Sequence, residues 1–193
     1  MQNINKGNPP DFFLEFVRKT KLKEWNDVAP VREQLREYIL QEEQKGCCVY
    51  TEIRIQDNKN CHIDHFRTRN LFPDKTFDYS NMLVACNSEN YGAKYKDKQI
   101  RNKADYDVLI NPVEDNPSDY MEYTFTGEIQ PVDQNERGCK TIECLNLNER
   151  RLVNRRKEAF INLNYMKNAL TEDELVHAIG EFETMIRQLY RQS

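Results

Sequence analysis

The sequence lacks the features of membrane and secreted proteins. No run of apolar residues approaches the length that crosses a membrane. The first residues, MQNINKGNPPDFF, lack the charged-then-apolar order of a secretory signal. None of the six cysteines forms a C-x-x-C pair, so a self-sufficient zinc knuckle is not expected. We therefore expect a cytoplasmic protein whose cysteines are reduced.

The chain also lacks internal repeats, low-complexity segments and a strong charge of either sign. Its net charge of −4 does not indicate nucleic-acid binding by the protein as a whole, so any basic surface must be local. The length of 193 residues suits one domain with appendages, and a hydrophobic fraction of 38% is enough for a core.

Hydrophobic patterns predict an α+β fold in three segments. Residues 1–46 are expected to form an N-terminal helical arm, and residues 47–101 a core that carries the chemistry. Residues 102–193 are expected to form a hairpin and a C-terminal helical extension. We expect all three to pack as one domain.

Helices are predicted from apolar spacing and from caps. The patterns predict helices over 11–19, from Pro30 to Gly46, and over 149–170. Thr171 begins a capping-box pattern, which predicts one final helix carrying the apolar residues up to Leu189.

Two hairpins are predicted from β-prone runs. The first joins residues 48–55 to residues 60–66 through the turn residues Asp57-Asn58, and a helical segment is expected from Asn81. The second joins YMEYTF to EIQPV through Thr126-Gly127.

The residues that carry chemistry lie between Cys47 and Lys98. His62 and His65 fall within four residues of each other, with Asp64 between them, and Asn81 follows. A base, a carboxylate and amides are the groups used in metal-assisted phosphodiester cleavage. Regular strand alternation would put Asp64 and His65 on opposite faces, so one shared site requires a bend near Asp64.

Four ordered motifs resemble the HNH nuclease family, and in particular the subfamily of Septu-type and retron-associated anti-phage defence nucleases. These motifs are CVYTE from Cys48, IDHFR from Ile63, FDYSNML from Phe77 and Cys86-x-x-x-Asn90. Further matches extend to Arg156, so the resemblance covers most of the chain. It implies a β-hairpin and a helix around one divalent metal ion, the ββα-metal motif.

The resemblance also implies a role for each site residue. It makes His65 the general base, Asp64 and Asn90 the metal ligands, and Asn81 the brace of the loop that holds the base. A role for Asn81 as a helix cap also remains open. His62 is either an added ligand or a solvated strand residue.

One divalent ion, Mg²⁺ or Mn²⁺, is the expected cofactor, because oxygen donors suit these metals. Many relatives also carry two C-x-x-C pairs for a structural zinc, but here these positions read Cys48…Thr51 and Cys86…Glu89. With half of the ligands lost, structural zinc is not expected. The spacing from Asn90 to the next lysine is one residue longer than in the family, so Asn87 is the alternative ligand.

Basic residues near these motifs are candidate nucleic-acid contacts. Residues 47–101 contain nine Lys and Arg against seven Asp and Glu, a local excess of two positive charges. We select Arg67, Arg69 and Lys94 as contacts, with a solvated charged face as the alternative. A second basic cluster lies within residues 150–157.

The sequence thus predicts a metal-dependent endonuclease that acts on DNA or on RNA, including tRNA. The resemblance implies an anti-phage role with an ABC or SMC-like ATPase partner, or with a retron reverse transcriptase and its msDNA. The alternative is a binding or adaptor module that kept the shape of the domain and lost turnover.

Overall fold

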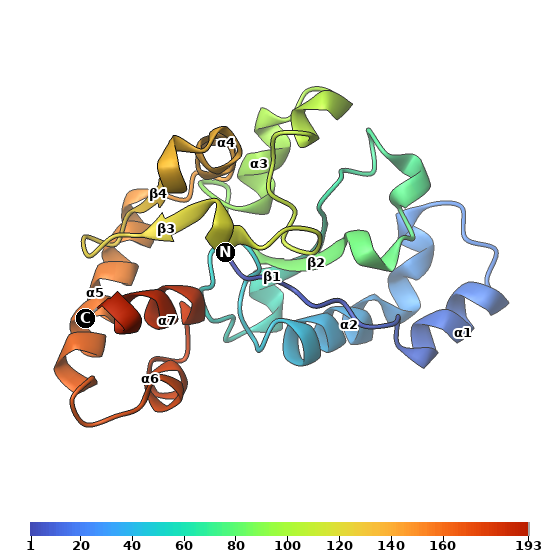
Figure 1. Cartoon of the computed structure of the whole chain (residues 1–193). Coiled ribbons are helices and arrows are strands. Elements are labelled where there is room, and N and C mark those ends of the chain that lie inside the picture. The colour runs from blue at the N-terminus through green and yellow to red at the C-terminus, as the bar shows by residue number, and fades with distance from the viewer. Residues whose placement is uncertain (193) are drawn as a thin grey trace.

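The computed structural model describes residues 1–192 and confirms the α+β class (Figure 1). Within these residues, seven α-helices surround two separate antiparallel strand pairs. The strands are β1 (Cys61–His65), β2 (Met82–Cys86), β3 (Met121–Tyr123) and β4 (Ile129–Pro131). The helices are α1 (Asp11–Lys19), α2 (Ala29–Tyr38), α3 (Ala93–Gln99), α4 (Glu136–Cys144), α5 (Arg150–Met166), α6 (Glu172–Ile179) and α7 (Glu183–Gln192).

The N-terminal helices follow the prediction closely. Helix α1 has the predicted bounds, and α2 begins one residue before Pro30 and continues as a π-helical turn to Glu43. Gly46 follows with a φ of 77°, as expected for a residue that ends a helix. Both helices bury apolar residues, such as Phe13 and Leu35, against one face of β1 and β2.

The predicted first hairpin is wrong. Residues 48–55 contain a turn instead of a strand, and their one ladder contact is a bridge between Cys47 and Arg54. Glu52 explains the break, because it has a left-handed backbone and a fully buried carboxylate. That carboxylate accepts hydrogen bonds from the Tyr123 hydroxyl at 2.6 Å and the Thr184 amide at 2.8 Å.

The partner of β1 is β2, where the sequence predicted a helical segment. Asp64 pairs with Leu83 and His65 with Met82 in an antiparallel register. Both faces of β2 are buried: Leu83 packs in one core cluster and Met82 in another. A strand covered on both faces has a continuous apolar sequence, which periodicity does not distinguish from a buried helix.

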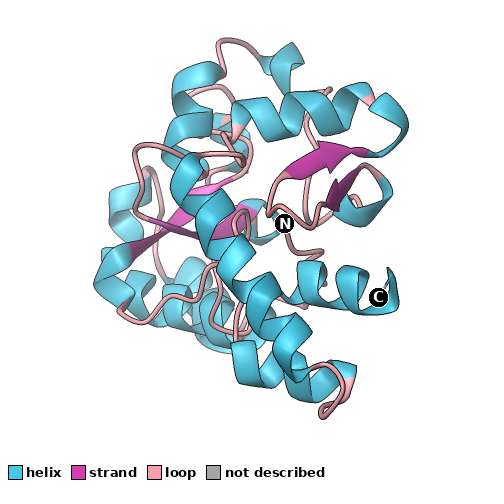
Figure 2. Ribbon diagram, turned by 90° about the vertical axis from the view of Figure 1, so that its left-hand side faces the viewer, coloured by secondary structure: helices cyan, strands magenta, loops and turns pink. Residues whose placement is uncertain are grey.

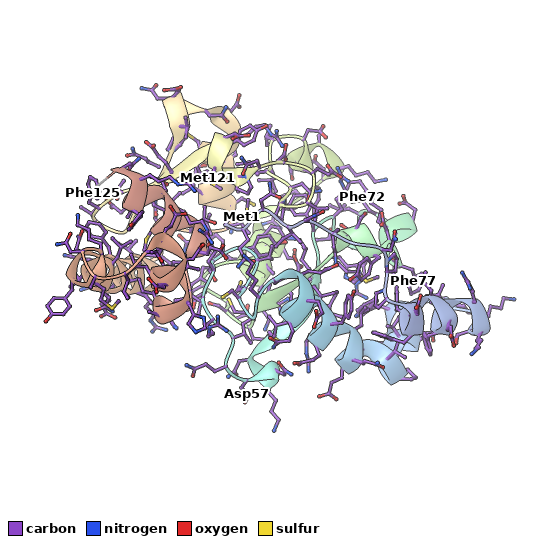
Figure 3. The ribbon with its side chains drawn as sticks, turned by 60° about the horizontal axis from the view of Figure 1, so that its bottom comes forward. Met1, Asp57, Phe72, Phe77, Met121 and Phe125 are labelled. Atoms are coloured by element: carbon purple, nitrogen blue, oxygen red, sulfur yellow. The ribbon has the colours of Figure 1, made fainter. Side chains whose placement is uncertain are left out.

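The second hairpin is confirmed as β3 and β4. Gly127 lies in its turn with a φ of 87°, and a Cβ there would stand 2.4 Å from the carbonyl oxygen of Val153 on α5. The turn therefore requires glycine. Figure 2 shows the two strand pairs as separate units among the helices. The turn also carries Phe125 near the edge of the molecule (Figure 3).

The predicted last helix is in fact two. Thr171 caps α6 with the expected capping box, but α6 ends at a left-handed Gly180. Phe182 also has a positive φ and is fully buried, which turns the chain so that α7 packs back on the core.

The largest core cluster contains residues from all three predicted segments, among them Ile4, Tyr50 and Leu189. The boundaries at residues 46 and 101 stay a prediction. No helix among residues 1–192 is long and apolar enough to cross a membrane.

Candidate functional site

A cleft of about 360 Å³ opens between β1, the loop that follows β1, and the end of α3. It is polar, and it gathers side chains that are far apart in the sequence. Its polar lining consists of His62, Asp64, His65, Thr68, Arg69, Asn70, Asp97 and Arg101. Asp64 and His65 therefore face one cleft at the end of β1, although alternation along a regular strand would separate them.

His65 is held in one orientation at the floor of this cleft. Its Nε2 lies 3.0 Å from the carbonyl oxygen of Thr76, and a carbonyl only accepts, so Nε2 carries the proton and donates. The Trp25 ring packs edge-on against the imidazole with 4.5 Å between ring centroids. In the neutral ring Nδ1 is therefore the nitrogen free to take a proton.

Burial determines the charge of His65. The side chain is 5% exposed, and desolvation lowers the pKa of His65 to about 4, although the Thr76 hydrogen bond and Asp64 act in the opposite direction. The imidazole is neutral at pH 7, which is the state that a general base requires.

Asp64 is an ionised carboxylate inside the core. Burial alone would raise the pKa of Asp64, but the Lys96 ammonium and the hydrogen bond from Tyr50 keep it below its usual value. The Tyr50 hydroxyl donates to Oδ2 at 2.5 Å, and Lys96 Nζ lies 3.2 Å from the same oxygen. Both donors therefore bind the same carboxylate oxygen, Oδ2.

Lys96 is fully buried and connects the strand to the helix. Beyond Asp64, its ammonium donates to the carbonyl oxygens of Phe66 at 2.8 Å and of His65 at 3.3 Å. It also lies 3.4 Å from the Asp97 carboxylate. One cation thus fixes the end of β1, and both acidic side chains, in place.

Asn81 braces the loop between β1 and β2. Its Oδ1 accepts from the Arg67 amide at 2.8 Å, and its Nδ2 donates to the carbonyl oxygens of Arg67 and Lys75 at 2.9 and 3.2 Å. Asp78, not Asn81, caps the short 3₁₀ turn at this point. These contacts have the form expected for a brace, and its catalytic importance stays a prediction.

Asn90 does not join the other predicted site residues. It lies in the exposed turn between β2 and α3, and its backbone carbonyl accepts from Asn146 Nδ2 at 2.8 Å. The alternative, Asn87, is also exposed and outside the cleft lining, but its Oδ1 lies 2.8 Å from His62 Nδ1. The structure therefore connects Asn87 to the cleft only through His62.

Asp97 is the site residue that sequence reasoning missed. It projects from α3 into the cleft, opposite β1, and burial raises the pKa of its carboxyl while Lys96 opposes the rise and Asp64 adds to it. The sequence feature that could have indicated Asp97 is Gly92, which has a φ of 73° and precedes the first residue of α3. Starting the helix there puts Ala93 and Lys96 on its buried side and Asp97 beside them.

The predicted nucleic-acid contacts divide into two kinds. Arg67 pairs with Glu114 at 3.1 Å and Lys94 pairs with Glu89 at 3.1 Å, so neither charge is free. Arg69 lines the cleft, as does Arg101, and both are exposed. The available positive charge at the cleft therefore comes from these two arginines.

Two residues of the second basic cluster are bound within the fold, and the others are exposed. Arg156 is buried and donates to the carbonyl oxygen of Leu147, and Arg155 forms a two-bond ion pair with Glu181. Arg150 and Arg151 remain exposed at the start of α5.

The residues at the four positions considered for zinc, Cys48, Thr51, Cys86 and Glu89, do not all come together. Cys48, Thr51 and Cys86 meet, with Thr51 Oγ1 4.0 Å from Cys86 Sγ, while Glu89 points outward to Lys98 at 2.7 Å. In the described part of the chain, no three His, Cys, Asp or Glu side chains are grouped closely enough to hold a metal ion. The absence of structural zinc stays an expectation.

The cleft fits a divalent ion in part. Asp64 and Asp97 offer hard oxygen donors of the type that Mg²⁺ and Mn²⁺ prefer. Two carboxylates alone leave most of an octahedral shell to water and to substrate oxygens. Such an ion would therefore bind weakly without substrate.

Comparison with known proteins adds a distant likeness. No family model matches the chain. It is 25% identical over 146 residues to the Septu protein PtuB of Bacillus mycoides (strain KBAB4), which covers 63% of this chain and 50% of that relative. It is 26% identical over 106 residues to the Septu protein PtuB of Bacillus thuringiensis, over 53% of this chain and 37% of that relative. The chain thus matches half or less of the length of these relatives.

Proposed function

We propose that this chain is a metal-dependent endonuclease of the HNH type that acts in a Septu-type anti-phage defence system. One observation carries the proposal: a neutral histidine and two carboxylates, from β1 and α3, line one polar cleft with two exposed arginines beside them. The order of β1, β2 and α3 supports it, because this is the order of the ββα-metal motif.

Each residue has a definite task in this proposal. His65 takes a proton from the attacking water at Nδ1, while Thr76 keeps the ring in place. Asp64 and Asp97 are the residues that would hold a divalent ion, and such an ion would supply stabilisation of negative charge on the phosphate. Arg69 and Arg101 attract the phosphates of the nucleic acid to the cleft.

His62 supports the ligands in the same proposal. Its Nδ1 donates to Asn87 Oδ1 at 2.8 Å, which leaves Nε2 to contact a phosphate. Asn81 braces the loop that follows β1 and carries Arg67. Asn90 is not among the metal ligands in this proposal, because it lies outside the cleft lining.

The defence role is supported by the likeness to two Septu proteins. Because the chain spans about half the length of the curated relatives that it matches, the activity of those whole proteins and their partners remains part of the proposal. We propose that the protein acts in the cytoplasm with an ATPase partner. The alternative partner is a retron reverse transcriptase with its msDNA.

The test is a cleavage assay with a matched pair of histidine variants. The chain is incubated with plasmid DNA and with RNA, including tRNA, in Mg²⁺ or Mn²⁺ and then with a chelator. His65→Ala should lower the rate by about 10²- to 10⁴-fold, the usual contribution of a general base. His177→Ala, on the exposed surface of α6, should keep the full rate. Full activity in His65→Ala would remove this residue from the mechanism.

A second candidate function is a binding module without turnover. The observation that favours it is the buried Lys96 ammonium, 3.2 Å from Asp64, because a built-in cation already neutralises the carboxylate that a metal would need. Two results together would establish this alternative. The chain would bind nucleic acid with an affinity that depends on Arg69 and Arg101, and the nucleic acid would stay intact with either metal and with the partner present.

A further inference from the structure

Two cysteines from distant parts of the chain meet behind the candidate nuclease site. Cys48 lies in the turn before β1, and Cys86 is the last residue of β2. The Cys86 amide donates to Cys48 Sγ at 3.4 Å, and Cys86 Sγ lies 4.0 Å from the hydroxyl oxygen of Thr51 in the same turn as Cys48. Neither sulfur has a place in the proposed hydrolysis.

The backbone holds the turn of Cys48 beside the end of β2. The Val49 amide donates to the Val84 carbonyl oxygen at 3.1 Å, so the turn lies directly beside β2. Gln44 adds side-chain bonds to the Val84 amide and carbonyl, at 2.7 and 2.8 Å. A disulfide requires Cβ atoms about 4 Å apart. Cys48 Sγ lies 3.4 Å from the amide nitrogen of Cys86, an atom two bonds from the Cys86 Cβ.

The other nearby cysteines point away from the pair. Cys47 Sγ donates to the Gly180 carbonyl oxygen at 3.7 Å. Cys61 is opposite Cys86 in the strand register, but its Sγ donates to the Asn58 carbonyl oxygen at 3.3 Å. The contact of Cys48 Sγ with the Cys86 amide therefore favours Cys48 with Cys86 over either competitor.

We propose that Cys48 and Cys86 form a reversible intramolecular disulfide when the protein meets a peroxide. This inference does not depend on the proposed nuclease activity. The bond would close a loop that contains β1, His65 and Asn81, and it would tie the end of β2 to the turn after α2.

The electrostatics agree with a reactive pair. Burial would raise the pKa of Cys48, but hydrogen bonds from Cys86 and Thr51 outweigh it and lower the pKa to about 6. The same contact raises the pKa of Cys86, so near pH 7 the thiolate of the pair is on Cys48 and the proton is on Cys86. A small oxidant approaches the pair from the side of Cys86, because this residue is partly exposed whereas Cys48 is buried.

The chemistry balances with peroxide as the oxidant. The Cys48 thiolate attacks one peroxide oxygen, and the O–O bond breaks to leave a sulfenic acid on Cys48 and hydroxide. Cys86 then loses its proton and attacks the Cys48 sulfur, the S–S bond forms, and the sulfenic oxygen leaves as hydroxide. With the two thiol protons, each hydroxide becomes water: two thiols and one peroxide give one disulfide and two waters.

The test treats the whole chain with hydrogen peroxide and counts thiols in denaturant. The count should fall from six to four per chain, and peptide mapping should find Cys48 joined to Cys86. The thermal midpoint should rise by about 5 to 10 °C and return to its starting value with dithiothreitol.

Serine variants provide the matched controls. Cys86→Ser should prevent the cross-link, and Cys48→Ser should do the same if it folds. Cys47→Ser and Cys61→Ser should keep it. Six thiols after treatment, a cross-link between other cysteines or between chains, or sulfinic acid without a cross-link would each overturn the proposal.

Discussion

The molecule contains two units with the same order of elements, two antiparallel strands followed by a helix (Figure 1). In the first, β1, β2 and α3 enclose a polar cleft. In the second, α4 packs tightly against the β3–β4 strand pair. The difference lies in the connections: residues 66–81 join β1 to β2, whereas residues 124–128 join β3 to β4.

Helix packing follows from this difference. A Cβ on Gly138 of α4 would stand 2.3 Å from the Tyr120 carbonyl oxygen, so α4 lies directly on the strand end. In the first unit, the long connection contributes Thr68 and Arg69 to the cleft wall and is braced by Asn81. The long loop thus adds polar and charged side chains to the cleft between β1 and the end of α3.

The largest expected effect concerns the ion pairs of the two units. Lys96→Met leaves the Asp64 carboxylate buried without its cation, which should lower the free energy of unfolding at pH 7 by about 3 to 5 kcal/mol. Arg137→Met breaks a pair with Asp115 that solvent partly screens, so its cost should be about 1 kcal/mol.

Urea unfolding of both variants beside the wild type measures this difference. Equal losses would mean that the two units stabilise their charges in the same way, and the contrast between them would fail. Part of the Lys96→Met loss should return at low pH, where protonation of Asp64 removes the buried charge.

The next effect concerns helix contact. Gly138→Ala should destabilise the fold by about 2 kcal/mol, because the new methyl group collides with backbone. Gly92→Ala, before α3, meets only Thr51 Cγ2 at 4.0 Å, so its cost comes from the backbone alone. A φ of 73° with a ψ of −145° strains any residue other than glycine by about 1 to 3 kcal/mol. Thermal midpoints measure both variants, and an unchanged midpoint for Gly138→Ala would contradict the account of how α4 packs.

A third effect of about 2 kcal/mol is expected from pH. The pKa of His65 is lowered from 6.5 in the unfolded chain to about 4 in the folded protein, so between these values the unfolded chain binds the proton that the folded protein does not. Stability is therefore complete above pH 6.5 and falls as the pH drops toward 4. At pH 5 the loss should be about 2 kcal/mol.

The variant His65→Gln isolates this contribution. Wild type and variant are unfolded in urea at pH 7 and at pH 5, with Trp25 fluorescence as the probe because its ring contacts His65. The wild type should lose about 2 kcal/mol more than the variant between the two pH values. An identical pH dependence would mean that the imidazole titrates normally.

Local patterns predicted a large part of this structure. The bounds of α1, the capping box at Thr171 and the β3–β4 hairpin depend on residues close in sequence, and all three are confirmed. The candidate base and its neighbouring carboxylate were also selected from the sequence, and they do line one cleft.

Other features depend on distant contacts. Asp97 is a candidate because the packing of α3 against β1 brings it into the cleft lining. Asn90 lies outside that lining, which again depends on how α3 packs. The buried Lys96 looked like one more surface lysine in a charged stretch.

The amino-acid order by itself determined the α+β class, most helices, one hairpin and the identity of His65 and Asp64 as candidates. Tertiary structure decided that β1 pairs with β2, that Asp97 faces Asp64, and that Cys48 meets Cys86. The physical reason is that caps and apolar periodicity act within a few residues, whereas strand pairing and the burial of a charge depend on what the rest of the chain packs against them.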